Sequence, residues 1–199
     1  MASKNINSKE GFTIIEVVLV LAIAGLIFLM VFIALPALQR SQRDTSRRND
    51  MSRVDTSLVQ YQTNNSSSKN NLPEGPSYWA GAETFGDNCG SNVACSFVQR
   101  YMNSGTDTAT NTFEDPDGSY YSMAISSNIE NADPNFTSPA AVSGDATNGW
   151  TLTTDFNDHI VYIFPGGQCD GEKVMKSTKR HFAILYRLEG AGIYCIDDQ

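Results

Sequence analysis

The chain has 199 residues, of which 41% are hydrophobic and 18% are charged, and its formal net charge is −8. This length holds one ordinary domain plus one apolar segment, which argues against a large multidomain enzyme. Residues 54–199 carry seven Lys or Arg against eighteen Asp or Glu. So acidic a body argues against a protein that must neutralise nucleic-acid phosphates.

A short polar segment, residues 1–11, opens the chain and leads into the sequence KEGFTIIE at residues 9–16. Gly11 has no Cβ, so a protease can accept an unusual backbone conformation at the bond before Phe12. Glu16 is unusual because an ionised carboxylate is unfavourable at the margin of a membrane helix. We therefore expect Glu16 to find a positively charged partner.

An apolar run follows at residues 17–38, with no charged residue in 22 positions. As a helix it would be about 33 Å long, which is enough to cross a bilayer. A secretory signal peptide has a shorter apolar core that ends in small residues at a cleavage site, so removal of the whole segment is disfavoured. Gly25 and Pro36 lie within the run, and Pro36 predicts a helix kink near residues 32–36.

The helical pattern continues through residues 39–63. Met51, Val54, Leu58 and Tyr61 recur at spacings of three and four, which places them on one helix face. The sequence thus predicts one helix of about 50 residues, with an apolar first half and an amphipathic second half. The Asn- and Ser-rich residues 64–68 predict that the helix ends there.

Residues 64–199 are expected to form a globular head. Asp115-Pro116-Asp117-Gly118 has the Pro and Gly placement of a β-turn. The last three predicted strands suggest an antiparallel meander. The expected elements are a short helix at 93–102 and strands at 120–125, 159–164, 181–188 and 192–196.

Four cysteines lie beyond the apolar run: Cys89, Cys95, Cys169 and Cys195. Their spacings do not match zinc knuckles, and an even count in an extracytoplasmic head favours two disulfides. The positive-inside rule disagrees, because Arg predominates just after the apolar run and points the head inward. The cysteines favour an outward head, and we follow them.

Sequence alone leaves three disulfide connectivities. Cys169 follows the Pro165-Gly166-Gly167 turn and Cys195 lies in the last predicted strand, so a meander can bring them close. We therefore predict the pair Cys169–Cys195, which leaves Cys89–Cys95 to close a small loop.

Other residue patterns point to no catalytic, cofactor or metal site. Asp115-x-Asp117-Gly118 invites a calcium loop, but the later ligand positions fail the EF-hand pattern. His159 and His181 have no acidic or Cys partner at ligand spacing, and we expect them to be solvated or hydrogen-bonded. A basic cluster at residues 173–181 falls between two predicted strands, where an exposed loop would contact DNA or an anionic surface in a salt-dependent way. A solvated hairpin loop is the favoured interpretation.

The segment from residue 9 to about residue 40 resembles the class III signal of type IV pilin precursors. The resemblance rests on the polar leader ending in Gly11, on Phe12, on Glu16 four residues later and on the unbroken apolar run. It implies that a prepilin peptidase cuts between Gly11 and Phe12 and methylates the new amine of Phe12. It also implies that this amine pairs with Glu16 of a neighbouring subunit, and that the chain is not itself an enzyme. Many pilins fasten their C-terminal region with one disulfide, so two bridges depart from the commonest pattern.

The expected fold is α+β, with a long N-terminal helix packed on an antiparallel sheet of three to five strands, as in a pilin. The expected domains are a leader at 1–11, a membrane and filament-core helix at 12–38, an amphipathic half at 39–63 and the head at 64–199. The precursor would be a single-pass membrane protein with an extracytoplasmic head, and the assembled form an extracellular pilus. Before assembly the helix would contact membrane lipid.

The expected partners are copies of the chain, minor pilins, the prepilin peptidase and the inner-membrane assembly machinery. Adhesion, twitching motility and DNA uptake are the functions that the resemblance implies for such a filament. Two alternatives remain open, a pseudopilin of a type II secretion system and a monomeric single-pass protein with an extracytoplasmic binding head.

Overall fold

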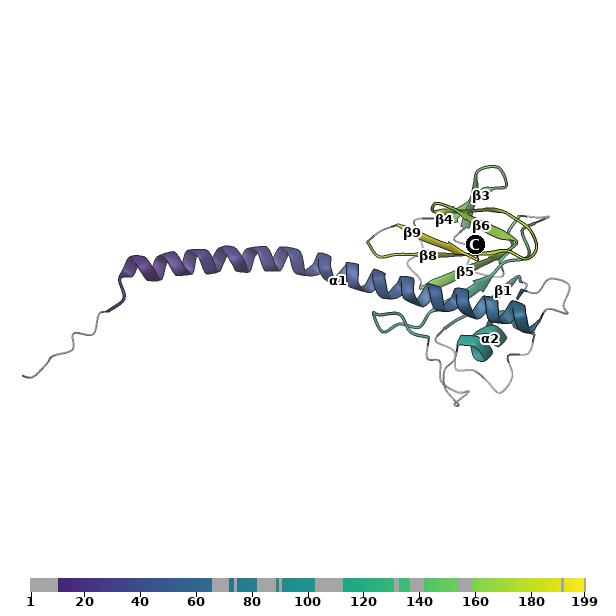
Figure 1. Ribbon diagram of the computed structural model, residues 1–199, viewed down its shortest axis with the longest axis horizontal. Coiled ribbons are helices and arrows are strands. Elements are labelled where there is room, and N and C mark those ends of the chain that lie inside the picture. The colour runs from purple at the N-terminus through teal and green to yellow at the C-terminus, as the bar shows by residue number, and fades with distance from the viewer. Residues whose placement is uncertain are drawn as a thin grey trace, which may run out of the picture. The chain divides into compact units, whose positions relative to one another are not determined.

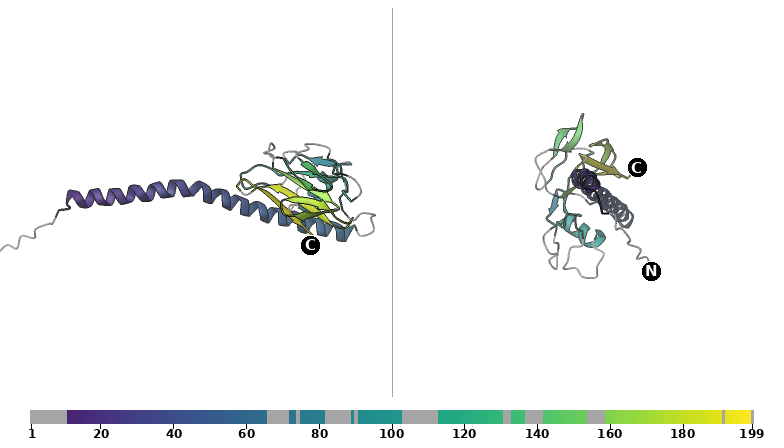
Figure 2. Two further views of the ribbon diagram at one scale, coloured as in Figure 1. Left: turned by 90° about the horizontal axis from the view of Figure 1, so that it is seen from above. Right: turned by 90° about the vertical axis from the view of Figure 1, so that its left-hand side faces the viewer.

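The computed structural model in Figures 1 and 2 describes most of the chain. The described residues are 11–65, 72–73, 75–81, 89, 91–102, 113–130, 133–136, 142–153, 159–190 and 192–198. The chain divides into two units, Met1–Ser41 and Gln42–Gln199, and each is considered by itself. The predicted leader, apart from Gly11, lies outside the described residues.

Helix α1 runs from Ile14 to Asn64 and contributes to both units. In the first unit its side chains are almost all apolar and exposed. In the second unit Met51, Val54 and Leu58 are fully buried, as their helical spacing predicts. Asn65 closes the helix, because its backbone and side-chain nitrogens both donate to the carbonyl oxygen of Tyr61 at 3.0 and 2.9 Å.

The second unit contains a five-stranded sheet with the strand order β1-β2-β5-β8-β9. Strands β2 and β5 are parallel, and the other neighbours are antiparallel. The strands are Ser77–Trp79 (β1), Ser122–Ile125 (β2), Ile160–Pro165 (β5), Phe182–Arg187 (β8) and Ile193–Asp197 (β9).

A second, antiparallel sheet has the strand order β3-β4-β7-β6. Its strands are Val142–Asp145 (β3), Gly149–Leu152 (β4), Gly167–Asp170 (β6) and Lys173–Lys176 (β7). A short helix α2, Val93–Phe97, continues into a π-helical turn η1, Val98–Met102. It occupies the place of the helix predicted at 93–102.

The five-stranded sheet is buried on both faces. Alternate residues point to opposite faces of a strand, so Val161 and Ile163 join the core under α1 and α2. Ile160 and Phe164 join a second core, which the four-stranded sheet covers with Trp150 and other side chains. Figures 1 and 2 show the resulting layers, with β3, β4 and β6 on the side of the five-stranded sheet away from α2.

The structure is α+β, as expected, but the prediction of a single antiparallel sheet was wrong in two respects. A parallel pair, β2 and β5, stands in the five-stranded sheet. The hairpin of β6 and β7 is inserted between β5 and β8 and belongs to the other sheet. The turn at residues 165–167 therefore leads into β6, and Lys173–Lys176 of the expected basic loop forms strand β7. Both sheets are needed because the strands of the first carry apolar residues on both faces.

Candidate functional site

The amino-terminal candidate site begins at Gly11 and Phe12, which precede α1 and are exposed. Thr13 and Glu16 form a reciprocal cap on the helix. The Oε2 atom of Glu16 accepts from the backbone N–H of Thr13 at 2.9 Å and from its hydroxyl at 2.8 Å. In return the Thr13 hydroxyl accepts from the Glu16 N–H at 3.4 Å. This is a capping box, and it places a negative charge near the positive end of the helix dipole.

The apolar part of α1 is exposed, apart from partly covered Ala24. Phe12 is 91% exposed and Phe32 74%. Among the described residues, α1 is the one helix long and apolar enough to cross a membrane, and none of its most apolar 18-residue window is buried within the chain. Such a surface demands an apolar surrounding from outside the chain.

Gly25 and Pro36 both lie inside α1. A Cβ added at Gly25 would meet no atom within 4 Å. Pro36 has no backbone N–H, so the carbonyl oxygen of Phe32 loses its helical donor. The expected kink stays a prediction.

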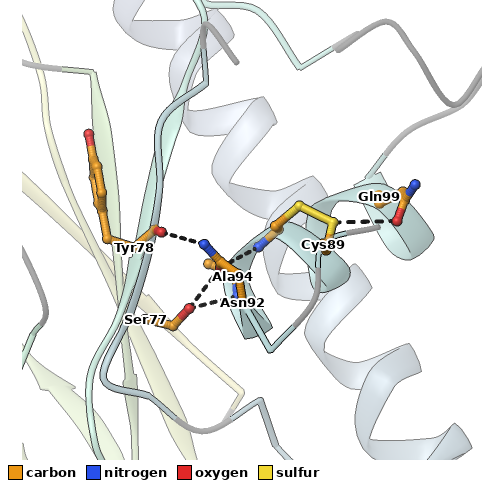
Figure 3. The surroundings of a disulfide bond; sticks show 7 residues. Ser77, Tyr78, Cys89, Asn92, Ala94 and Gln99 are labelled. Carbon is orange, nitrogen blue, oxygen red and sulfur yellow. Dashed lines mark hydrogen bonds between the residues drawn. A yellow bond between two sulfur atoms is a disulfide. The ribbon is translucent and has the colours of Figure 1, made fainter. Parts of the chain in front are cut away.

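The structure pairs Cys89 with Cys95 and Cys169 with Cys195, the pairing expected from the sequence. The first bridge lies beside the start of α2, where Asn92 is the N-cap and accepts from the backbone N–H of Cys95 at 3.0 Å (Figure 3). The second bridge joins β6 of the four-stranded sheet to β9 of the five-stranded sheet. It therefore ties the two sheets together.

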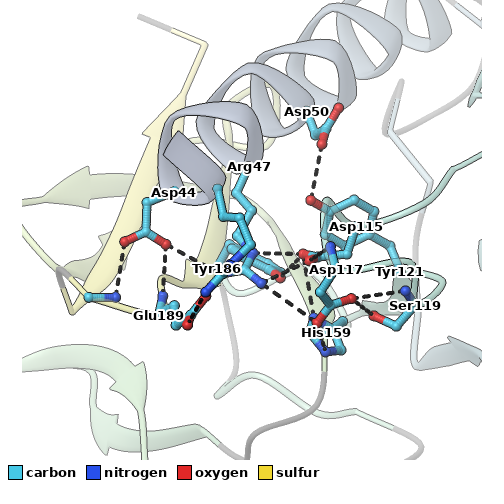
Figure 4. Close-up of polar contacts among 12 residues, drawn as sticks. Asp44, Arg47, Asp50, Asp115, Asp117, Ser119, Tyr121, His159, Tyr186 and Glu189 are labelled. Atoms are coloured by element: carbon cyan, nitrogen blue, oxygen red, sulfur yellow. Dashed lines mark hydrogen bonds and ion pairs between the residues drawn. The ribbon is translucent and has the colours of Figure 1, made fainter. Parts of the chain in front are cut away.

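A second candidate site is a polar cluster beneath α1, which we call the Arg47 cluster (Figure 4). Its members are Asp44, Arg47, Asp115, Asp117, His159, Tyr186 and Glu189. Arg47 and Asp115 form its buried centre. The Nε and Nη2 atoms of Arg47 donate to the two carboxylate oxygens of Asp115 at 2.7 and 2.8 Å. The hydroxyl of Tyr186 donates to the same carboxylate at 3.0 Å.

The cluster also fastens α1 to the turn after β8. The carboxylate of Asp44 accepts from the backbone N–H groups of Glu189 and Gly190 at 2.9 and 3.0 Å. The carboxylate of Glu189 accepts from Arg43 at 2.6 and 2.8 Å and from Arg47 at 3.3 Å. Asp44 accepts two backbone hydrogen bonds, and Arg43 donates to both carboxylate oxygens of Glu189. Paired contacts of this kind fix the orientation of α1 against the turn as well as its distance from it.

His159 closes the cluster on its open side. Its ring nitrogens lie 3.4 Å from Oδ2 of Asp115 and 3.2 Å from Oδ2 of Asp117. Sequence spacing could not identify these acidic partners of His159, because Asp115 and Asp117 are 44 and 42 positions away and only the fold brings them to the ring. The β-turn expected at 115–118 is present, with the Gly118 N–H donating to the Asp115 carbonyl oxygen at 2.9 Å.

The electrostatics hold the centre of the cluster ionised. Burial acts to raise the pKa of Asp115, but hydrogen bonds from Arg47 and from the Asp117 amide, with the charge of Arg47, outweigh it and bring the pKa to about 2. The hydrogen bond to Asp115 raises the pKa of Arg47. Burial raises the pKa of Tyr186, so its hydroxyl keeps the proton that it donates.

A cavity of about 440 Å³ borders the cluster, with Arg43, Asp117, His159 and Arg187 in its wall. Ligand atoms of Asp115, Asp117 and His159 lie within 4.8 Å of one another. The Asp115 carboxylate already binds Arg47, whose Nε lies 2.7 Å from Oδ2. A cation bound to the same carboxylate would be repelled by the nearby guanidinium. We therefore assign the cluster to fastening the helix rather than to metal binding.

The sequence interpretation missed Asp44 and Arg47, yet a signal was present. Counting back from Met51 and Val54 by the same helical spacing reaches residues 47 and 44, so two charged residues continue the apolar face. A charged pair on a core face predicts buried partners elsewhere in the fold.

Comparisons with protein-family models, curated proteins and solved structures found no match to the chain.

Proposed function

We propose that the chain is a type IV pilin or a close pilin-like relative. It is a membrane-anchored precursor that a prepilin peptidase cuts before Phe12, and the mature subunit polymerises through its N-terminal helix into an extracellular filament. It is a structural subunit and not an enzyme. Its partners are copies of itself, minor pilins and the membrane assembly machinery.

One observation carries this proposal: residues 17–38 of α1 are apolar and, apart from partly covered Ala24, exposed, and Glu16 is the only ionisable side chain from residue 12 to residue 38. Lipid covers this apolar surface before assembly, and the same segments of neighbouring copies cover it in the filament. A lone carboxylate at the start of that segment calls for a positive partner in either setting.

The geometry at Glu16 suits such a partner. The backbone N–H and the hydroxyl of Thr13 both donate to Oε2, so among the described residues Oε1 is left open to a donor from a neighbouring copy. A cut before Phe12 would create an α-amino group and leave the Thr13 amide and hydroxyl in place. The capping box and a charge pair with the amine of a neighbouring subunit are therefore compatible.

The head agrees with an extracytoplasmic location. Two disulfides belong to an oxidising compartment. The acidic head would form the outer surface of the filament, where a net charge keeps surfaces soluble. Adhesion, motility and DNA uptake remain the candidate roles of the filament.

The deciding experiment is intact-mass and N-terminal peptide analysis of the protein recovered from cells that carry a prepilin peptidase, with a peptidase-deleted strain as control. We expect a mature chain that starts at methylated Phe12 and is absent from the deleted strain. A chain that keeps Met1 in both strains would show a monomeric anchored protein instead.

A Glu16 series then separates the charge from the cap. Glu16→Gln keeps a residue that serves in a capping box but removes the charge, whereas Thr13→Ala removes the hydroxyl and keeps the charge. We expect both variants to be cut, and filament yield, measured by shearing and pelleting, to fall at least about tenfold in Glu16→Gln for a lost charge pair. Thr13→Ala should retain most of the yield. Normal filaments from Glu16→Gln would contradict the charge pair.

A further inference from the structure

The second half of α1 has two unlike flanks on either side of its buried face. Arg53 and Asp55 are two residues apart, which corresponds to about 200° around the helix axis. Met51, Val54 and Leu58 occupy the buried face between them. The two charges therefore point away from each other at nearly the same height.

The Arg53 flank borders a groove of about 350 Å³ between α1 and Tyr101 of η1. Apart from Arg53, the α1 side of the groove is made of hydroxyl and amide side chains, and Arg53 is the one charged residue in its wall within the part of the chain that the structure describes. The Arg53 side chain is 49% exposed and lies 3.5 Å from the Asp50 carboxylate. That carboxylate also accepts from the Tyr121 hydroxyl at 3.1 Å. Asp50 thus holds one side of the Arg53 guanidinium, and the exposed side can still bind an acidic group. We call this surface the basic groove.

The opposite flank borders β9 and the residue that follows it. Asp55 is half-buried, and its Oδ1 is buried with no hydrogen-bond partner among the described residues. Burial raises the pKa of Asp55, and the nearby carboxylates of Asp198 and Asp197 raise it further. Asp197 and Asp198 are held in place, because they accept from the backbone N–H groups of Cys169 and Phe182 at 2.7 and 3.4 Å. We call Asp55, Asp197 and Asp198 the acidic flank.

An imidazole and a guanidinium stand near the acidic flank. The Nδ1 atom of His181 lies 3.0 Å from Asp198, and the guanidinium of Arg48 lies over the ring of Tyr194, 5.6 Å from its centre. Three carboxylates still face one imidazole and one guanidinium. Among the described residues, no cation pairs with Asp55.

We propose that a second copy of the chain supplies that cation: in the polymer, the acidic flank of one copy packs against the basic groove of the next, with Arg53 directed at Asp55. The inference rests on the proposed function. Two different surfaces that meet on successive copies make a heterologous contact, which continues without closing and suits a filament. The apolar helices supply the affinity, and the charged contact selects the register between copies.

A charge exchange on α1 tests the contact in the full chain. Arg53→Asp places like charges in the contact and should lower filament yield at least about tenfold. Asp55→Arg should lower it less, because Asp197 and Asp198 remain. The double variant Arg53→Asp with Asp55→Arg restores opposite charges and should recover most of the yield. Lys179→Asp makes a matching charge reversal at an exposed site that belongs to neither the basic groove nor the acidic flank, and should leave the yield near that of the unmodified chain.

Membrane-resident protein of each variant is first checked for both disulfides and for its melting temperature. Normal yield from Arg53→Asp, an equal loss from Lys179→Asp, or no recovery in the double variant would each overturn the contact while leaving the proposed function intact. Failure of the unmodified chain to form filaments would instead refute the proposed function, and the inference with it.

Discussion

At the scale of single residues, Arg47 is a charged side chain at a helix position that belongs to the core. Its side chain is 5% exposed, and that of Asp115 is fully buried. Removing one partner of a buried pair leaves the other charge uncompensated, which costs far more than the pair gains. The pair therefore fixes the position of α1 along the head, because a shift of the helix by one turn would leave both charges buried without a partner.

Replacing Arg47 with Met should reveal that cost. Arg47→Met fills a similar volume and leaves Asp115 and Asp44 without their cation, so we expect the free energy of unfolding to fall by about 3 to 5 kcal/mol. Arg53→Met is the matched control on the exposed flank, with an expected loss of about 0 to 1 kcal/mol. Urea unfolding of the full chain in detergent, followed by circular dichroism, measures both. Equal losses would contradict the role given to the buried pair.

The residues of the two candidate sites differ in how far sequence defines them. Gly11, Phe12 and Glu16 are close together in the chain, so their spacing could be interpreted directly, and the structure adds only that Glu16 and Thr13 together cap the start of α1. Arg47 and Asp115 are 68 residues apart, and no spacing rule connects them. Their meeting depends on how α1 packs against residues 113–121, where Tyr121 also donates to Asp50, and local propensity does not encode that packing.

At the scale of elements, the long helix and the strands of the five-stranded sheet with strong apolar runs were predicted, and the second sheet was missed. Its strands are short and mostly polar, so their own composition resembles loop. Two hairpin signals were nevertheless present, Asp170-Gly171 between β6 and β7 and Asn148-Gly149 at the start of β4. Gly171 and Gly149 have φ angles of 62° and 77°, in the left-handed region that such turns need.

The disulfide between β6 and β9 should contribute more to stability than the one beside α2. Cys169 and Cys195 are 26 positions apart, whereas Cys89 and Cys95 are 6 apart. The chain-entropy model gives about 3.5 kcal/mol for the larger ring and about 2.4 kcal/mol for the smaller. We expect the double serine variant of the larger ring to melt at the lower temperature, by calorimetry of the full chain in detergent. The reverse order would show that enthalpy in the folded state outweighs ring size.

At the scale of the whole molecule, stability should respond to pH through two carboxylates of opposite behaviour. The pKa of Asp115 is about 2, below its ordinary 3.8, so its contribution is complete above about pH 4 to 5 and is lost as the pH falls toward 2. Burial, with Asp198 and Asp197, raises the pKa of Asp55 above 3.8. Its cost is present above that raised value and disappears as the pH falls to about 4.

Two neutral variants should separate these effects. Asp115→Asn should melt at a lower temperature than the unmodified chain at pH 7, and the difference should narrow below pH 4. Asp55→Asn should melt at a higher temperature at pH 7, and this gain should shrink in acid. Melting curves from pH 3 to 8 measure both, with Asp170→Asn at an exposed site as the control. A lower melting temperature for Asp55→Asn at pH 7 would contradict the assignment of Asp55 as an uncompensated charge.

The contact between Arg47 and Glu189 also sets an order of events during synthesis. The two residues are 142 positions apart, and at about 5 to 20 residues per second the ribosome needs about 7 to 30 s to make that stretch. During the first part of that interval Arg47 lacks its partner Asp115, which has not yet been synthesised. During all of it, Asp44 and Arg47 also lack the turn after β8. Because lipid rejects such charges, Asp44 and Arg47, with Arg40 and Arg43 before them, keep this part of the emerging helix out of the membrane well before the head exists to hold it.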